Sequence, residues 1–155
     1  MNLFLNKLFL QGKLMLVESS EEIKKSYFEK SESNLISSKI LFKENRLEEA
    51  VALTYFSMYN LVLALLFGVG IKCENHSAGI ILLKNVFELD NNLLIEAKKE
   101  RIDKKYYTDF SIVKEEVIQG IFSAENFNRN LKAFILQLNN QKITFYRDKF
   151  RELLK

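Results

Sequence analysis

The sequence contains no proline and only five glycines among its 155 residues, and it has one cysteine and one histidine. Proline and glycine most often end helices and form turns, so their scarcity predicts long uninterrupted helices. One cysteine cannot form an internal disulfide bond, and one cysteine with one histidine gives too few ligands for a structural zinc site. We therefore expect an all-α protein without a metal or other cofactor, in a reducing, cytoplasmic compartment.

The composition is that of an ordinary soluble domain. Hydrophobic residues make up 48% of the chain and charged residues 28%, and a chain of this length is most simply one domain, here residues 1–155. The longest uncharged apolar stretch, Leu61–Ile71, is too short to cross a bilayer, so we expect no membrane partner. The net charge of +3 is compatible with a polyanionic partner but does not require one.

Patterns in the first part of the chain predict a short helix followed by a long one. Residues 1–17 have the apolar spacing of a short amphipathic segment that lies on the body of the fold. Residues 19–22 form a capping-box pattern that begins a helix reaching about Leu41. Ser31 and Ser38 lie on the apolar stripe of this helix, where small side chains would allow a neighbouring helix to approach closely.

The second long helix is predicted to be the buried centre of a bundle. It begins with a capping-box pattern at 45–48 and continues to Phe67 through VALTYFSMYNLVLALLF, which is apolar nearly all round. A third helix should begin at Asn75 or Ser77, and a fourth at about 90–92. Towards the C-terminus we expect a short helix over Val113–Ile121 and a long final helix, which begins at Ser123 and continues past Phe145.

The stretch SYFEKSESNLISSKILFKENRLEEAVALTYFSMYNLVLALLFGVGIKCENHS resembles a HEPN domain (higher eukaryotes and prokaryotes nucleotide-binding). The resemblance continues through KKERIDKKYYTDF and SAENFNRNLKAFILQL and covers about residues 23–138. It implies a bundle of four to five helices around a buried central helix, often paired as a homodimer. It also implies membership of a family that includes metal-independent RNA-cleaving toxins, commonly encoded beside a small nucleotidyltransferase antitoxin.

The catalytic pattern of that family is an arginine followed, four to six residues later, by a histidine. Arg101 matches the arginine, Tyr106 follows it after four intervening residues, and no histidine follows anywhere. The resemblance implies that Arg101 holds a phosphodiester and that Tyr106 acts as an acid or an orienting hydroxyl. It also makes Tyr106 and Tyr107 acceptors for a modification by the partner protein.

Arg101 lies within a basic run that could bind RNA or a nucleotide phosphate, since a guanidinium binds phosphate oxygens in a bidentate manner. The residues predicted to bind the phosphate groups are Lys98, Arg101, Lys104 and Lys105. Three acidic residues interleave with them, so the alternative is a solvated helix face without a binding role.

His76 is the best intrinsic general base in the chain near neutral pH, and we count it among the candidate catalytic residues. The alternative is structural, with Asn75, His76 and Ser77 capping a helix and forming hydrogen bonds to a neighbour. Cys73 lacks a base held by a third group, so a buried thiol is the expected state. Four residues at helical spacing in the most apolar segment are expected in the core or at a dimer interface: Tyr55, Phe56, Met58 and Tyr59.

Two functions follow. The first is a HEPN toxin that binds RNA or a nucleotide phosphate. The most specific version of this hypothesis is a metal-independent endoribonuclease. The second is a catalytically inactive HEPN module that dimerises and binds a nucleotidyltransferase partner. No histidine follows Arg101, which argues against catalysis and so favours the second function. The same absence does not argue against binding of RNA or a nucleotide phosphate.

Overall fold

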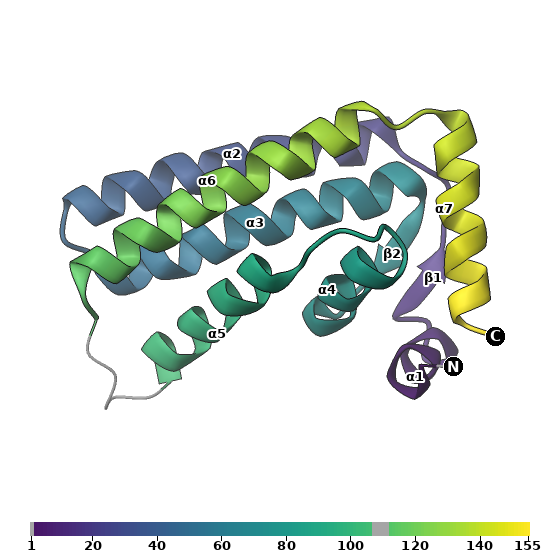
Figure 1. The fold of residues 1–155 in the computed structure, drawn as a ribbon, viewed down its shortest axis with the longest axis horizontal. Coiled ribbons are helices and arrows are strands. Elements are labelled where there is room, and N and C mark those ends of the chain that lie inside the picture. The colour runs from purple at the N-terminus through teal and green to yellow at the C-terminus, as the bar shows by residue number, and fades with distance from the viewer. Residues whose placement is uncertain (1, 107–111) are drawn as a thin grey trace.

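The computed structural model in Figure 1 confirms an all-α bundle. It describes residues 2–106 and 112–155, and for Lys104, Lys105 and Tyr106 it describes the backbone alone. The described residues form seven helices and one two-stranded sheet. The elements are α1 (Leu3–Leu10), β1 (Leu14–Leu16), α2 (Glu21–Lys43), α3 (Leu47–Val69), β2 (Ile71–Cys73), α4 (His76–Asn85), α5 (Asn92–Tyr106), α6 (Lys114–Leu136) and α7 (Asn140–Leu153).

Helix α3 is the centre of the bundle, as expected from its nearly uniform apolar sequence. It packs against α2, α5 and α6, while α4 and α7 cover its C-terminal end (Figure 1). Its length and composition would also suit a membrane span, but 61% of its most apolar window is buried inside the protein. Burial against the other helices therefore accounts for its apolar character.

Small hydroxyl side chains join α2 and α3, as the positions of Ser31 and Ser38 predicted. Ser31 Oγ donates to the Ser57 carbonyl (2.6 Å) and Ser57 Oγ donates back to the Ser31 carbonyl (2.8 Å). About two turns further along α2, Ser38 Oγ donates to the Ala50 carbonyl of α3 (3.0 Å). Asn128 Nδ2 of α6 donates to Ser57 Oγ (2.9 Å), so the three long helices meet at one buried hydrogen-bonded group.

The starts of α2 and α3 differ from the expected ones. Ser20, one residue after Ser19, caps α2, and its hydroxyl accepts from the Ile23 amide. Arg46 occupies the N-cap position of α3 without a side-chain capping bond. Asn45 has a positive φ of 59° and forms the turn between the two helices, because asparagine tolerates the left-handed region better than most residues.

The predicted break at Ser123 is wrong. Helix α6 continues through that position, and the chain instead turns after Leu136. No glycine or asparagine with capping geometry stands near residue 123, whereas Asn139 accepts from the Lys142 amide and begins α7. Local capping chemistry, rather than the apolar seam, decides where this helix ends.

The N-terminal segment attaches to the C-terminal end of α3. The expected short amphipathic helix is α1, with Leu5 and Leu8 buried. The sequence did not predict the antiparallel pair that follows it, in which β1 bonds to β2. Arg147 of α7 donates through Nη1 to the carbonyls of Val17 (2.6 Å), Val69 (3.1 Å) and Gly70 (3.0 Å). It therefore joins the segment after β1 to the C-terminal end of α3, where the Val69 carbonyl has no partner within the helix.

Replacing Ser57 with alanine should lower the free energy of unfolding by about 1–3 kcal/mol, because buried partners on α2 and α6 lose a hydrogen bond. Urea unfolding followed by circular dichroism measures this loss. Ser26→Ala, at an exposed position of α2, is the matched control and should change stability by less than about 0.5 kcal/mol. Equal stability of the two variants would contradict the role given to the buried hydroxyl.

Candidate functional site

Arg101 does not extend into bulk water but lies against two aromatic rings of α3. Its guanidinium carbon is 5.2 Å from the ring centroid of Tyr55 and 4.9 Å from that of Phe56. A guanidinium at this distance from a ring face is attracted by the electrons of the ring. The Nε atom of Arg101 is buried and has no hydrogen-bond partner. The central helix therefore fixes the guanidinium in place and leaves part of its donor capacity unused.

His76 lies in the same cluster, at the first residue of α4. Asn75 caps this helix by accepting from the Ala78 amide (2.9 Å), which confirms the structural interpretation of the segment. The imidazole stacks on Tyr59 with ring centroids 3.9 Å apart, and Nδ1 is 2.8 Å from the hydroxyl oxygen of Tyr55. Gly79 allows this packing, because a Cβ there would lie against the Tyr59 ring.

The surroundings of Tyr55 and His76 indicate which of the two carries the shared proton. Burial raises the pKa of Tyr55 to about 12, although the charge of Arg101 lowers it in part, so the phenol keeps its proton. Burial, with the charges of Arg101 and Lys98, lowers the pKa of His76 below its usual value of 6.5, so the imidazole is neutral at pH 7. We infer that the phenol donates to Nδ1 and that Nε2 carries the proton.

Lys98 adds a second cation one helical turn before Arg101. Its ammonium group donates to Ser77 Oγ (2.5 Å) of α4. Burial lowers the pKa of Lys98, and the nearby charge of Arg101 lowers it further. Among the side chains that the structure describes, no carboxylate forms an ion pair with Arg101 or Lys98. Two partly buried cations beside a neutral imidazole form a site that favours an anion.

The structure thus brings together three of the predicted site residues, Arg101, Lys98 and His76, although 25 positions separate the first from the last in sequence. It also adds Tyr55 and Phe56, which sequence reasoning placed in the core or at a dimer interface. Their aromatic spacing gave no signal of a contact with Arg101, since that contact depends on how α5 packs on α3.

The remaining predicted site residues stay predictions. The side chains of Lys104, Lys105 and Tyr106, and Tyr107 as a whole, lie outside the described residues.

Cys73 has the state expected for it. Cys73 is 7% exposed, and burial raises the pKa of its thiol, so the thiol is not an activated nucleophile. Within the described ranges, no three carboxylate, imidazole or thiol groups lie close enough to hold a metal ion together.

Since His76 is the only histidine, its imidazole proton resonances report the site directly. We expect the NMR signal to titrate with a pKa below 6.5, and Arg101→Gln to raise that pKa by removing a neighbouring positive charge. Because the unfolded chain would bind this proton more readily, stability should fall as the pH drops below 6.5.

Arg129→Gln, which removes an exposed arginine of α6, is the charge-matched control. It should leave the pKa of His76 where it is. An identical rise in both variants would mean that overall charge, rather than the contact with Arg101, sets the pKa.

Comparison with known proteins identifies the family. The HEPN domain profile matches residues 25–134, which is more than half of the chain. The chain is also 26% identical over 133 residues to the protein named "Putative toxin MJ0605" of Methanocaldococcus jannaschii, an alignment that covers 81% of this chain and 98% of that protein. The buried central helix, the helical bundle and the profile match agree, and the chain belongs to the HEPN domain family.

Proposed function

We propose that this protein is a cytoplasmic HEPN toxin that binds the phosphate groups of RNA at the cluster of Arg101, Lys98 and His76. The observation that carries the proposal is the position of Arg101, which is held against Tyr55 and Phe56 with a buried donor that has no partner. Family membership and the similarity to a protein named as a toxin support the same class of function.

Phosphate binding follows from the geometry of the donors. A guanidinium presents several N–H groups in one plane and binds two phosphate oxygens at once. The ammonium group of Lys98 adds charge, and the Nε2–H of a neutral His76 adds one more donor. Partial burial strengthens these interactions because water screens them less. The predicted phosphate contacts of Lys104 and Lys105 would extend this basic surface along α5.

Cleavage makes further demands on the site. A ribonuclease needs a base for the 2′-hydroxyl proton and an acid for the leaving oxygen. The hydrogen bond from Tyr55 occupies Nδ1 of His76, which leaves the imidazole better suited to orienting a phosphate than to removing a proton. Tyr106 is proposed as the acid or orienting hydroxyl, and Tyr106 or Tyr107 as the acceptor for modification by a small nucleotidyltransferase antitoxin.

Fluorescence anisotropy with a labelled single-stranded RNA tests binding, and gel analysis of the same RNA in the presence of EDTA tests metal-independent cleavage. We expect saturable binding that Arg101→Ala weakens by about tenfold or more, since a charged hydrogen bond contributes ~1.5–3 kcal/mol. Arg129→Ala, which removes the same charge from the surface of α6, should bind as the wild type does.

Equal binding by wild type and Arg101→Ala would contradict the proposed site. Cleavage in EDTA that Arg101→Ala abolishes would identify a ribonuclease. Binding without cleavage would identify the catalytically inactive module, and equal trace cleavage by both proteins would mark contamination.

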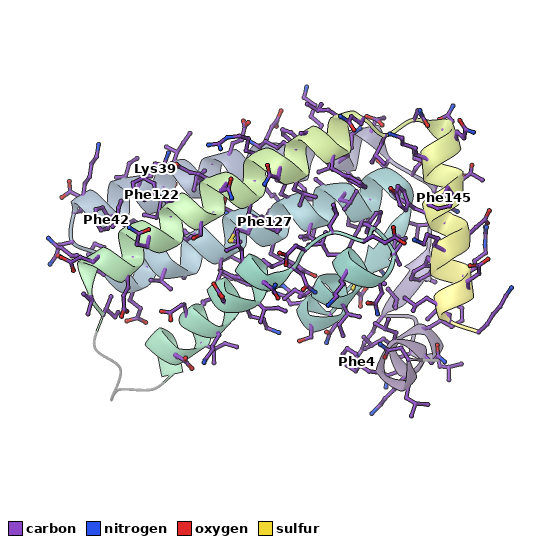
Figure 2. The ribbon with its side chains drawn as sticks, viewed as in Figure 1. Phe4, Lys39, Phe42, Phe122, Phe127 and Phe145 are labelled. Atoms are coloured by element: carbon purple, nitrogen blue, oxygen red, sulfur yellow. The ribbon has the colours of Figure 1, made fainter. Side chains whose placement is uncertain are left out.

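We also propose a homodimer, formed through apolar side chains that α2 and α6 expose. Ile36 and Ile40 of α2 are 60% and 55% exposed, and Phe122 of α6 is 54% exposed. Phe122 lies towards the end of the bundle where α2 carries Phe42 (Figure 2). Neighbouring exposed apolar groups of this kind often mark a protein–protein contact.

Light scattering after gel filtration should give the mass of a dimer, and the double substitution Ile36→Lys with Phe122→Lys should give a folded monomer. Leu10→Lys, at an 86% exposed position of α1, is the control and should remain dimeric. A wild-type protein that elutes as a monomer at micromolar concentration would overturn the dimer.

A further inference from the structure

Helix α1 exposes apolar side chains on the side that faces away from the bundle. Leu5 and Leu8 anchor the helix, because both are buried in the core. Successive residues of a helix are rotated by about 100° around its axis, so Leu3 and Leu10 lie opposite this anchoring side. Exposed apolar side chains make up half of its eight residues: Leu3 (75% exposed), Phe4 (41%), Phe9 (46%) and Leu10 (86%). The outer side of a surface helix is normally polar, so this one is suited to contact a second apolar phase.

The fold holds this outer side in a fixed position. An isolated helix of this length would be marginal in water, but Asn2 caps its start by accepting from the Leu5 amide (3.2 Å). The Lys13 amide donates to the Leu8 carbonyl (2.9 Å), and strand β1, which follows, pairs with β2. Helix α1 lies at the end of the molecule opposite the turn between α2 and α3 (Figure 1), and Phe4 marks that end in Figure 2. The exposed side chains therefore project from a rigid, convex support.

Positive charge accompanies this apolar surface. Residues 2–17 include two lysines, Lys7 and Lys13, and no acidic residue. Both lysines are exposed, and Lys7 lies on the outer side of α1 between the two exposed leucines. Among the described residues, neither lysine forms an ion pair. Glu74, which follows β2, is paired with Lys72, so these two add no net charge.

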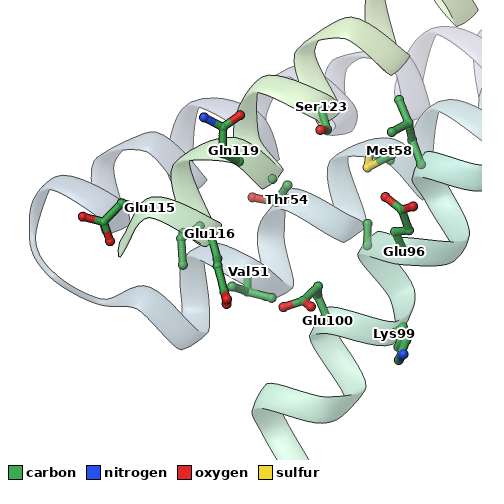
Figure 3. Close-up of a pocket in the computed structure, with 14 residues that line it drawn as sticks. Val51, Thr54, Met58, Glu96, Lys99, Glu100, Glu115, Glu116, Gln119 and Ser123 are labelled. Carbon is green, nitrogen blue, oxygen red and sulfur yellow. The ribbon is translucent and has the colours of Figure 1, made fainter. Parts of the chain in front are cut away.

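The pocket between α3, α5 and α6 has the opposite charge. It has a volume of about 580 Å³, and its lining includes the apolar side chains of Met58 and Val117 (Figure 3). Four glutamates and one lysine also line it. Negative charge at that place disfavours an anionic partner, whereas the lysines of α1 attract one.

We propose that the outer side of α1 rests on the surface of a lipid bilayer that contains anionic lipids. Leu3 and Leu10 would enter the boundary between headgroups and acyl chains, as the apolar side of an interfacial helix does. Lys7 and Lys13 would pair with lipid phosphates, since a lysine can keep its methylene groups on apolar surface while its ammonium group reaches the headgroups. A bilayer adapts to a convex helix without a matching groove. A second copy of this chain would instead bring the lysines of two chains together.

Such a contact differs from a membrane span. The expectation of no membrane partner rested on the length of the apolar stretches, and an interfacial helix does not cross the bilayer. Helix α3, which is long and apolar enough to span, is largely buried inside the bundle and takes no part. The proposal does not depend on RNA binding at Arg101.

Flotation of the purified protein with lipid vesicles tests the contact. On vesicles of equal parts phosphatidylcholine and phosphatidylglycerol, we expect binding that saturates as lipid is added. Vesicles of phosphatidylcholine alone should bind the protein at least about tenfold more weakly, because each lysine near an anionic surface contributes roughly a fivefold gain. High salt should reduce this difference, since it screens the charges.

The chain contains no tryptophan, so a single introduced tryptophan reports its own surroundings. Leu10→Trp places the indole on the outer side of α1, and Leu136→Trp places it at a 77% exposed position at the end of α6. On the anionic vesicles, the emission of Leu10→Trp should shift to shorter wavelength and that of Leu136→Trp should not. Equal shifts in both variants, or no shift in Leu10→Trp, would overturn the proposal.

Substitutions at exposed positions separate the apolar contribution from the charged one. Leu3→Ser with Leu10→Ser should weaken vesicle binding by about tenfold or more, because two leucines no longer leave water. Lys7→Gln with Lys13→Gln should remove most of the preference for the anionic vesicles. Circular dichroism checks that both variants fold.

Two controls remove charge elsewhere and should bind the vesicles as the wild type does. Lys43→Gln with Lys114→Gln removes two exposed lysines at the opposite end of the bundle (Figure 1). Arg101→Ala removes the proposed RNA contact, so the two proposals fail separately. The membrane contact is overturned if neither kind of vesicle binds, if both bind equally, or if the lysine control loses the preference as the α1 variant does. It is also overturned if Leu3→Ser with Leu10→Ser changes the mass in light scattering, which would assign the surface to a second copy.

Discussion

The burial of α3 on nearly all sides is the constraint on which the other features of this protein depend. Reciprocal hydrogen bonds between Ser31 and Ser57 allow α2 to approach α3 closely, and Asn128 brings α6 to the same place. With α2 and α6 so placed, α5 and α4 pack on the remaining surface of α3. On that surface, the rings of Tyr55 and Phe56 contact Arg101 of α5.

The two sides of α5 have different surroundings. One side holds Lys98 and Arg101 against α4 and the aromatic rings of α3, where a neutral His76 completes a cationic cluster. The other side presents Glu96 and Glu100 to a pocket with an apolar lining. Charges that are neighbours in the sequence of α5 therefore have different surroundings in the fold, and Lys99 lines the pocket together with Glu96 and Glu100.

Much of the fold could be predicted from the sequence, because the decisive signals were local or periodic. The apolar character of α3 and the serines of α2 predicted the central helix and its close neighbour. The starts of α2 and α3 were displaced by one residue, and the break at Ser123 was wrong, because capping geometry rather than apolar spacing fixes helix ends. The β1–β2 pair, three residues long in each strand, gave no pattern to detect.

The candidate site was predictable only in part. The family resemblance singled out Arg101, and the rarity of histidine singled out His76, but neither indicated that the two lie in one cluster. That contact arises from tertiary packing of α4 and α5 on α3, as do the contacts of Arg101 with Tyr55 and Phe56. The sequence therefore indicated residues with suitable chemistry, and the fold was needed to show which of them meet.

The most direct test of the anion site is a titration of the protein with uridine 3′-monophosphate, followed through the NMR signal of its one histidine. If Arg101 and His76 face the same bound phosphate, the signal of His76 shifts to saturation in the wild type and does not shift in Arg101→Gln. A signal that stays unchanged in the wild type, or that shifts equally in the variant, would contradict the account.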